Sequence, residues 1–231
     1  MNNILVLQSD FGLVDGAVSA MIGVALEESP TLKIHHLTHD ITPYNYRLFQ
    51  TVDYWPEGTT FVSVVDPGVG SKRKSVVAKT SKNQYIVTPD NGTLSFIKKH
   101  VGIVAIREIS EVENRRKNTE HSYTFHGRDV YAYTGAKLAS GHISFEEVGP
   151  ELSVEEIVEI PVVETRLADN LVSGAIDILD VRFGSLWTSI TREEFCTLEP
   201  SFGDRFEVTI YNNDMLVYQN QVTYGKSFAD V

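Results

Sequence analysis

The sequence predicts an α/β protein, with an N-terminal α/β domain built on a largely parallel central sheet and a smaller C-terminal antiparallel β-barrel-like domain. In the first part of the chain, apolar strand-like runs alternate with helical segments, which is typical of parallel pairing. In the last part, short strand patterns are divided by Gly, Asn and Asp turns, as in small antiparallel domains. An acidic stretch with Pro150 and Pro161 separates the two parts. We therefore expect domains at 1–150 and 166–231, joined by a linker at 151–165.

The elements of both domains follow from the hydrophobic pattern. Residues 4–7 are continuously apolar and predict a strand buried on both faces. Residues 14–28 carry apolar side chains at helical spacing and predict a helix that stops before Pro30. Residues 111–121 are charged and lack periodicity, so they predict an exposed loop. The other expected elements are strands at 33–37, 60–65, 75–79, 84–87, 103–109, 171–179, 186–191, 206–211 and 215–218, and helices at 46–54 and 129–139.

The composition argues against several classes of function. A net charge of -11 repels phosphate backbones, which disfavours nucleic-acid binding. No apolar run approaches the roughly 20 residues that span a bilayer, and the N-terminus lacks the features of an export signal, so we expect no membrane association. The single cysteine, Cys196, can form neither an internal disulfide nor a thiolate metal site. Together these features predict a cytoplasmic protein.

The segment from Asp66 to Arg73, with sequence DPGVGSKR, is the first candidate site. It places a carboxylate at the end of a predicted strand and a guanidinium further along a glycine-rich loop. A phosphate-binding loop is one alternative, but such loops lead into a helix, whereas residues 75–79 look like a strand. The other alternative is a tight turn closed by a structural ion pair, and the segment alone gives that alternative equal weight.

Two more polar side chains lie near the ends of predicted elements. His126, in the segment FHGRD, precedes a helix, and histidine can hold or take a proton near neutral pH. The alternative for this segment is a helix start with a structural pair between Arg128 and Asp129. Asp10 follows the first strand, where ligands bind in open α/β sheets and a carboxylate can accept hydrogen bonds from a ribose diol. The alternative for Asp10 is a helix N-cap.

Four neighbouring residues have the composition of a metal site: His35, His36, His39 and Asp40. On a strand, successive side chains point to opposite faces, so the four groups cannot all converge on one ion. We expect neither a metal ion nor another cofactor.

Taken together, five separated segments resemble the S-adenosyl-L-methionine (SAM) hydrolases, also called SAM hydroxide adenosyltransferases, which are relatives of the fluorinases and chlorinases. The resemblance implies a homotrimer with substrate sites between subunits, and a C-terminal β-barrel after the α/β domain. The segments are Ser9–Gly12, Thr42–Pro43, Val65–Gly70 with Arg73, Pro89–Gly92 and Phe125–Asp129.

The resemblance also implies roles for individual residues of the first domain. The catalytic triad of the family falls on Asp66, Arg73 and His126. Asp10 stands where the family binds the ribose hydroxyls, and Tyr44 stands where relatives place an aromatic ring against the sugar or base. The halogenating relatives lack the aspartate of the triad, and its presence here favours water or hydroxide as the nucleophile.

In the second domain, the segment from Asp180 to Thr188 is similar to the family's Asp-x-x-Phe-Gly-Asn-x-x-Thr-Asn segment. By that resemblance Asp180 binds the ammonium group of methionine and Phe183 stacks on adenine. Ser185 and Ser189 replace two asparagines of the family, and a hydroxyl cannot offer adenine the paired donor and acceptor of an amide. The chain also stops at Val231, before the last strands that the family usually has, which leaves a shortened domain or a different adenine pocket as alternatives.

The activity implied by the resemblance is hydrolysis of SAM to adenosine and L-methionine, by attack of activated water on the ribose C5'. Two alternatives stay open. One is halide-dependent adenosyl transfer, which yields 5'-halo-5'-deoxyadenosine. The other is a module that binds adenosine or SAM without catalysis, for which Ser185 and the early end of the chain are the best support.

Overall fold

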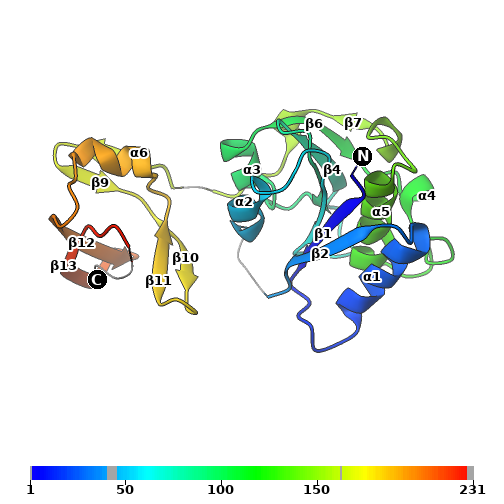
Figure 1. Ribbon diagram of the computed structural model, residues 1–231, viewed down its shortest axis with the longest axis horizontal. Coiled ribbons are helices and arrows are strands. Elements are labelled where there is room, and N and C mark those ends of the chain that lie inside the picture. The colour runs from blue at the N-terminus through cyan, green and yellow to red at the C-terminus, as the bar shows by residue number, and fades with distance from the viewer. Residues whose placement is uncertain (1, 41–45, 162, 228–231) are drawn as a thin grey trace. The chain divides into compact units, whose positions relative to one another are not determined.

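The computed structural model describes residues 2–40, 46–161 and 163–227 of the chain (Figure 1). The chain divides into two compact units, Met1–Ile160 and Pro161–Val231, and each unit is described by itself. Among the described residues, no helix combines the length and the apolar character needed to cross a membrane.

The first unit is built on a seven-stranded sheet of order β2-β1-β3-β5-β4-β6-β7. The pairs β2/β1, β1/β3 and β3/β5 are parallel, and the pairs β5/β4, β4/β6 and β6/β7 are antiparallel. Five of the seven strands, β2, β1, β3, β5 and β6, therefore point in the same direction, which confirms the large, mostly parallel central sheet expected from the sequence. The strands are β1 (Ile4–Ser9), β2 (Lys33–Thr38), β3 (Thr60–Val64), β4 (Ser75–Thr80), β5 (Tyr85–Pro89), β6 (Ile103–Glu108) and β7 (Glu151–Leu152).

Helices cover both faces of this sheet (Figure 1). Leu5 and Leu7 of β1 face a cluster that includes Met21 from α1, whereas Val6, between them, faces a cluster that includes Leu48 from α2. This alternation buries β1 on both faces, as its continuous apolar run requires. The helices are α1 (Ala17–Glu28), α2 (Tyr46–Val52), α3 (Ser95–His100), α4 (Glu111–Asn114), the π-helix η2 (Gly127–Ala132), α5 (Tyr133–Ser140) and the short 3-10 helices η3 (Glu146–Val148) and η4 (Val154–Glu156).

Helix α5 packs very closely on the sheet at Gly135. A Cβ atom built on Gly135 would lie 2.3 Å from Cγ2 of Val62 in β3, which is closer than packed atoms can approach. The glycine therefore sets the distance between this helix and the sheet, and with it the position of η2, which continues directly into α5.

The exposed loop predicted at 111–121 is wrong for its first part. Residues 111–114 form α4, and Asn114 is fully buried. Its side-chain amide donates hydrogen bonds to the carbonyl oxygens of Glu147 (3.2 Å) and Val148 (2.8 Å), and the buried Arg115 donates to the carbonyl oxygen of Ser122. Polar side chains with internal partners pack this segment, so it shows no apolar periodicity.

Other element boundaries also differ from the expectation. The first helix begins at Ala17 rather than at residue 14. The helix expected at 129–139 begins earlier, because η2 extends the helical segment back to Gly127. Helix α3 was not predicted at all.

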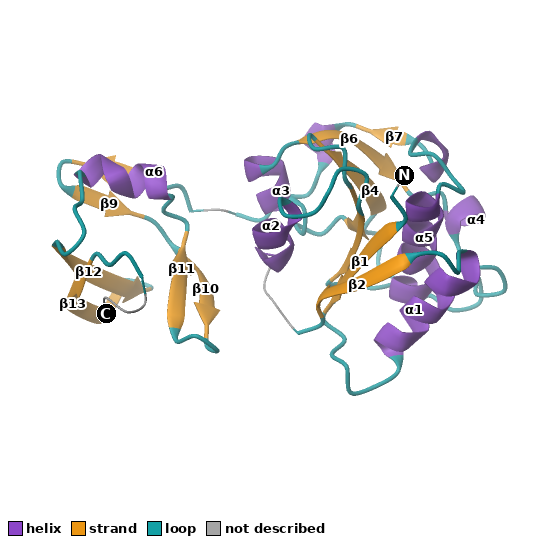
Figure 2. Cartoon of the chain, in the orientation of Figure 1, coloured by secondary structure: helices purple, strands orange, loops and turns teal. Residues whose placement is uncertain are grey.

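The described part of the second unit contains three two-stranded antiparallel sheets (Figure 2). Its antiparallel β character is confirmed, whereas a closed barrel is not seen among the strands that the structure describes. The expected strand at 171–179 is split in two, and at the break the backbone N–H of Ala175 donates to the hydroxyl of Ser189 (3.0 Å). The elements are β8 (Arg166–Ala168) with β9 (Leu171–Ser173), β10 (Ile176–Asp180) with β11 (Ser185–Thr188), β12 (Arg205–Asn212) with β13 (Met215–Thr223), and the helices α6 (Arg192–Phe195) and η5 (Cys196–Leu198).

Candidate active site

The candidate site lies at the edge of the sheet where the parallel strands β1 and β3 end. Asp10 directly follows β1, and its backbone N–H donates a hydrogen bond of 3.3 Å to the carbonyl oxygen of Val64, the last residue of β3. Asp66 follows two residues later. The two carboxylates therefore come from neighbouring strand ends, at the edge where ligands bind in open α/β sheets.

The loop after Asp66 is a compact double turn that leads into a strand. Hydrogen bonds join the N–H of Val69 to the carbonyl oxygen of Asp66 (3.3 Å) and the N–H of Ser71 to that of Gly68 (3.0 Å). The chain then enters β4 at Ser75. Because no helix begins here, the loop lacks the helix N-terminus on which a phosphate-binding loop depends.

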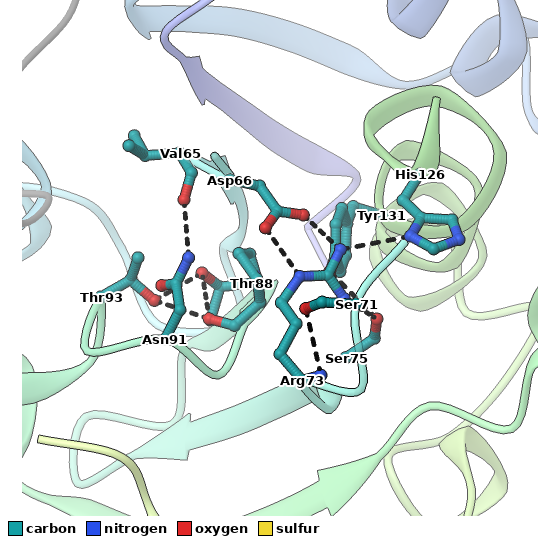
Figure 3. Close-up of polar contacts among 11 residues, drawn as sticks. Val65, Asp66, Ser71, Arg73, Ser75, Thr88, Asn91, Thr93, His126 and Tyr131 are labelled. Carbon is teal, nitrogen blue, oxygen red and sulfur yellow. Dashed lines mark hydrogen bonds and ion pairs between the residues drawn. The ribbon is translucent and has the colours of Figure 1, made fainter. Parts of the chain in front are cut away.

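Arg73 and Asp66 form a buried, bidentate ion pair (Figure 3). Nε of Arg73 donates to Oδ1 of Asp66 over 2.7 Å, and Nη2 donates to Oδ2. The two side chains are only 9% and 3% exposed, so solvent screens the pair weakly. Burial by itself lowers the pKa of Arg73, but the hydrogen bond and charge of Asp66 outweigh it and raise that pKa above its ordinary value.

His126 completes the group (Figure 3). Its Nδ1 lies 3.2 Å from Nη2 of Arg73. A guanidinium has only donors, so Nδ1 is the acceptor and the ring hydrogen lies on Nε2. Burial lowers the pKa of His126, and the charge of Arg73 lowers it further against an opposing effect of Glu111. The imidazole is thus neutral at pH 7, and its buried Nε2 donor has no hydrogen-bond partner among the described residues.

The FHGRD segment is held against the turn that carries Asp10. The rings of Phe11 and Phe125 meet edge to face, with centroids 5.8 Å apart. A Cβ atom on Gly127 would lie 2.9 Å from two atoms of the Phe11 ring, so only glycine allows this approach. Burial raises the pKa of Asp10, and the negative charge of Asp66 adds to the effect.

Two residues that support Arg73 escaped the sequence analysis. Nη1 of Arg73 donates to Oγ of Ser75 (3.5 Å), and this hydroxyl lies 3.0 Å from the hydroxyl of Tyr131. Tyr131 is fully buried, and the guanidinium lies over its ring at 5.8 Å from the centroid. Burial raises the pKa of Tyr131 above its ordinary value, so the phenol stays protonated. The available signal was its place in the helix that follows the FHGRD segment.

The structure thus brings together Asp66, Arg73 and His126, with Asp10 near them. Tyr44, like the Thr42–Pro43 segment, lies outside the described residues. The remaining predicted site residues belong to the second unit.

In that unit, Asp180 ends β10 and lies opposite Ser185 of β11 in the hairpin. Asp180 is 4% exposed, which is unusual for a carboxylate, whereas Phe183 at the tip of the hairpin is 77% exposed. An aromatic ring exposed to that degree is available for stacking.

His35 and His36 lie in β2, and His39 follows it. Among the residues that the structure describes, no group of three or more His, Cys, Asp or Glu side chains could hold a metal ion. The ring of His35 packs on Trp55 with centroids 5.3 Å apart, while Nδ1 of His36 lies 2.7 Å from Nε2 of His39. His35 and His36 therefore point to opposite faces of β2, as the sequence argument required.

Comparison with known proteins assigns the family. The family description "SAM hydroxide adenosyltransferase N-terminal domain" matches residues 5–149, which is more than half of the chain. The chain belongs to the SAM hydroxide adenosyltransferase family. Asp66, Arg73, His126 and Asp10 all lie within the matched region of this family.

Relatives in the family include enzymes with two names. The chain is 36% identical over 201 residues to an (R)-S-adenosyl-L-methionine hydrolase from Methanocaldococcus jannaschii, which covers 83% of this chain and 68% of the relative. It is also 36% identical to an enzyme of the same name from Salinispora tropica, covering 67% of this chain but only 59% of the relative. A fluorinase from Nocardia brasiliensis is 28% identical, over 90% of this chain and 77% of its own length.

A solved structure supports the fold over nearly all of the chain. The crystal structure of an uncharacterized conserved protein from Thermotoga maritima has a TM-score of 0.88 and 31% identity, and covers 98% of this chain and 84% of that one. The similarity therefore extends beyond the region that the family description matches.

Proposed function

We propose that this protein hydrolyses SAM to adenosine and L-methionine, with Asp66, Arg73 and His126 activating the attacking water. The observation that carries the proposal is the buried network in which one guanidinium contacts both a carboxylate and a neutral imidazole. Relatives named (R)-S-adenosyl-L-methionine hydrolase support the choice of substrate.

The proposed reaction is an in-line displacement at the ribose C5'. The water proton passes along its hydrogen bond to the carboxylate of Asp66, the water oxygen forms the new bond to C5', and the C5'–S bond breaks with its electrons remaining on sulfur. The leaving group is then a neutral thioether, which needs no protonation. The site therefore requires no general acid, and catalysis consists of generating and aiming the nucleophile.

Each member of the triad has a distinct role in this proposal. The charge of Arg73 stabilises the developing hydroxide, and Asp66 holds Arg73 and accepts a hydrogen bond from the water. Nδ1 of His126 already accepts from Arg73, so Nε2–H is the position left to contact the water oxygen. This geometry favours an orienting role for His126 over a role as the proton acceptor.

Substrate binding is proposed for residues in both units. In the first unit, Asp10 binds the ribose hydroxyls and Tyr44 lies against the sugar or base. In the second, Asp180 binds the methionine ammonium, and Phe183 and Ser185 contact adenine. The burial of Asp180 and the exposure of Phe183 are compatible with these roles.

The proposal extends to the assembly, a homotrimer in the cytoplasm with a β-barrel in the second unit and active sites between subunits. The family resemblance and the single cysteine are its support. Light scattering would test the assembly: three chains of 25.8 kDa are expected per particle, and a monomeric mass would refute it.

The deciding experiment is incubation of the purified protein with SAM, followed by chromatography for adenosine and L-methionine. Asp66→Ala, Arg73→Ala and His126→Ala are expected to bind adenosine while losing most of the turnover. His142→Ala is the control, since that ring is about half exposed and pairs with Glu28 on the surface. Equal loss of adenosine affinity in all three triad variants would assign these residues to binding instead.

Halide-dependent adenosyl transfer is the second candidate, because fluorinases also align with most of the chain. The same incubation with added chloride or fluoride separates the two candidates. Formation of 5'-halo-5'-deoxyadenosine in place of adenosine would establish halide transfer.

A further inference from the structure

His39 is a buried histidine that the proposed mechanism does not use. It lies just after β2 and is 5% exposed. Its Nδ1 lies 2.6 Å from Oγ of Ser9, and its Nε2 lies 2.7 Å from Nδ1 of His36. Its carbonyl oxygen accepts a hydrogen bond of 2.7 Å from the backbone N–H of Gly12. The side chain and the main chain of one residue thus hold the first and last residues of the Ser9–Gly12 turn.

The hydrogen bonds around His39 have a consistent direction. Burial, together with the proximity of His36, lowers the pKa of His39 to about 4, so its ring is neutral at pH 7 with one donor and one acceptor nitrogen. The backbone N–H of Phe11 donates to Oγ of Ser9 (3.4 Å), and in one consistent arrangement the Ser9 hydroxyl donates to Nδ1 of His39. Nε2–H of His39 then donates to His36. Both ring nitrogens of His39 thus have a complementary partner, which ties the turn to the end of β2.

Two other functions of this cluster are disfavoured by the geometry. Ser9 is fully buried, so its hydroxyl is closed to a substrate and cannot serve as a nucleophile. The facing nitrogens of His36 and His39 point at each other over 2.7 Å instead of converging on a third point, as two ligands of one ion would. The cluster is therefore a hydrogen-bonded support.

What it supports is the turn that carries Asp10. The N–H of Asp10 donates to the carbonyl oxygen of Val64, which fixes the turn to β3, and His39 fixes the same turn to the end of β2. We propose that His39 is a positioning residue for the substrate, which holds the carboxylate of Asp10 where it meets the ribose hydroxyls. This inference rests on the proposed function, because it takes Asp10 as a ligand of the sugar.

Three variants on or beside β2 test the inference. His39→Leu removes both side-chain hydrogen bonds at similar volume, while His39→Asn keeps an acceptor oxygen close to the position of Nδ1 and so preserves the contact with Ser9. His35→Asn is the matched control, because His35 faces the other side of the strand against Trp55. The measurements are the adenosine dissociation constant by calorimetry, and KM and kcat with SAM.

His39→Leu is expected to weaken adenosine binding and to raise KM, each on the order of tenfold, as the loss of two ordinary hydrogen bonds predicts, while kcat changes little. His39→Asn is expected to recover most of the loss, and His35→Asn to behave as the unmodified protein. A merely structural role would lower the melting temperature without this separation of KM from kcat.

Unchanged adenosine binding and KM in His39→Leu would overturn the inference, as would a fall in kcat alone. If His39→Leu does not fold, Ser9→Ala takes its place: it removes one hydrogen bond and is expected to weaken adenosine binding about fivefold, and unaltered binding would again overturn the inference. Failure of the proposed function looks different, because the unmodified protein would then release no adenosine from SAM.

Discussion

Removal of either partner of the ion pair between Asp66 and Arg73 is expected to destabilise the fold strongly. Both side chains are nearly buried, at 3% and 9% exposure, and removing one partner of such a pair leaves an uncompensated charge, which costs roughly 3–5 kcal/mol. Arg73 keeps contacts with Ser75 and His126 when Asp66 is changed, so we expect the lower end of that range, about 3 kcal/mol, for Asp66→Asn. Arg73→Met leaves the carboxylate buried and is expected to cost as much.

The double variant Asp66→Asn/Arg73→Met removes both charges, and it is expected to recover at least half of the loss, because a neutral replacement of a buried pair is often tolerated. Urea unfolding measures this as a shift of the midpoint by roughly 1 M in each single variant and a smaller shift in the double variant. Asp53→Asn is the control, since its pair with Lys82 is about half exposed and is worth roughly 0–1 kcal/mol. Two outcomes would refute the claim that burial makes loss of one partner costly: losses of stability that add up in the double variant, or single variants that are as stable as Asp53→Asn.

Further predictions concern the support of the triad, its pH dependence and the helix behind it. Tyr131→Phe removes the hydroxyl that contacts Ser75 and is expected to lower kcat about fivefold at unchanged KM. Tyr133→Phe in the next helix is the control and is expected to leave kcat unchanged. A changed KM in Tyr131→Phe would contradict this. Burial lowers the pKa of His126, and its protonated ring cannot accept a hydrogen bond from a guanidinium. We therefore expect turnover above that pKa and its loss as the pH falls through it. A kcat profile with its acid limb above pH about 6.5 would contradict this. Gly135→Ala is expected to destabilise the fold by about 1–3 kcal/mol, because its Cβ would meet Val62. Gly23→Ala in α1, where the space is open, is expected to stabilise the fold by up to about 1 kcal/mol. Melting temperatures that do not differ between the two variants would refute the packing argument.

The sequence was sufficient to predict the parts of the site that lie at strand ends. The apolar runs of β1 and β3 are unambiguous, and the residue that follows a parallel strand must lie at the edge where ligands bind. Asp10 and Asp66 could therefore each be placed at that edge from the sequence, whereas their neighbouring positions follow from the pairing of β1 with β3. The strand at 75–79 likewise excluded a phosphate-binding loop, and β4 confirms it.

The missed features are those in which polar side chains do the packing. Asn114 is fully buried because its amide meets two carbonyl groups, and no apolar pattern marks such a position. No motif marks Tyr131 in the sequence, because its contact with Ser75 joins positions that are far apart in the chain. The sequence indicates His39 only as a potential metal ligand, because it shows which side chains are near each other along a strand but not which groups of other strands they contact.

The hydrogen-bonding roles in the triad bear on which nucleophile it can hold. Arg73 and Asp66 carry opposite charges, and His126 is neutral with its hydrogen on Nε2, so the three side chains together have no net charge. A nucleophile between them meets a carboxylate that only accepts and an imidazole N–H that only donates. Water can satisfy both at once, whereas a halide accepts from the imidazole but is repelled by the carboxylate. The neutral state of His126 and the negative charge of Asp66 thus both favour hydrolysis over halogenation at this site.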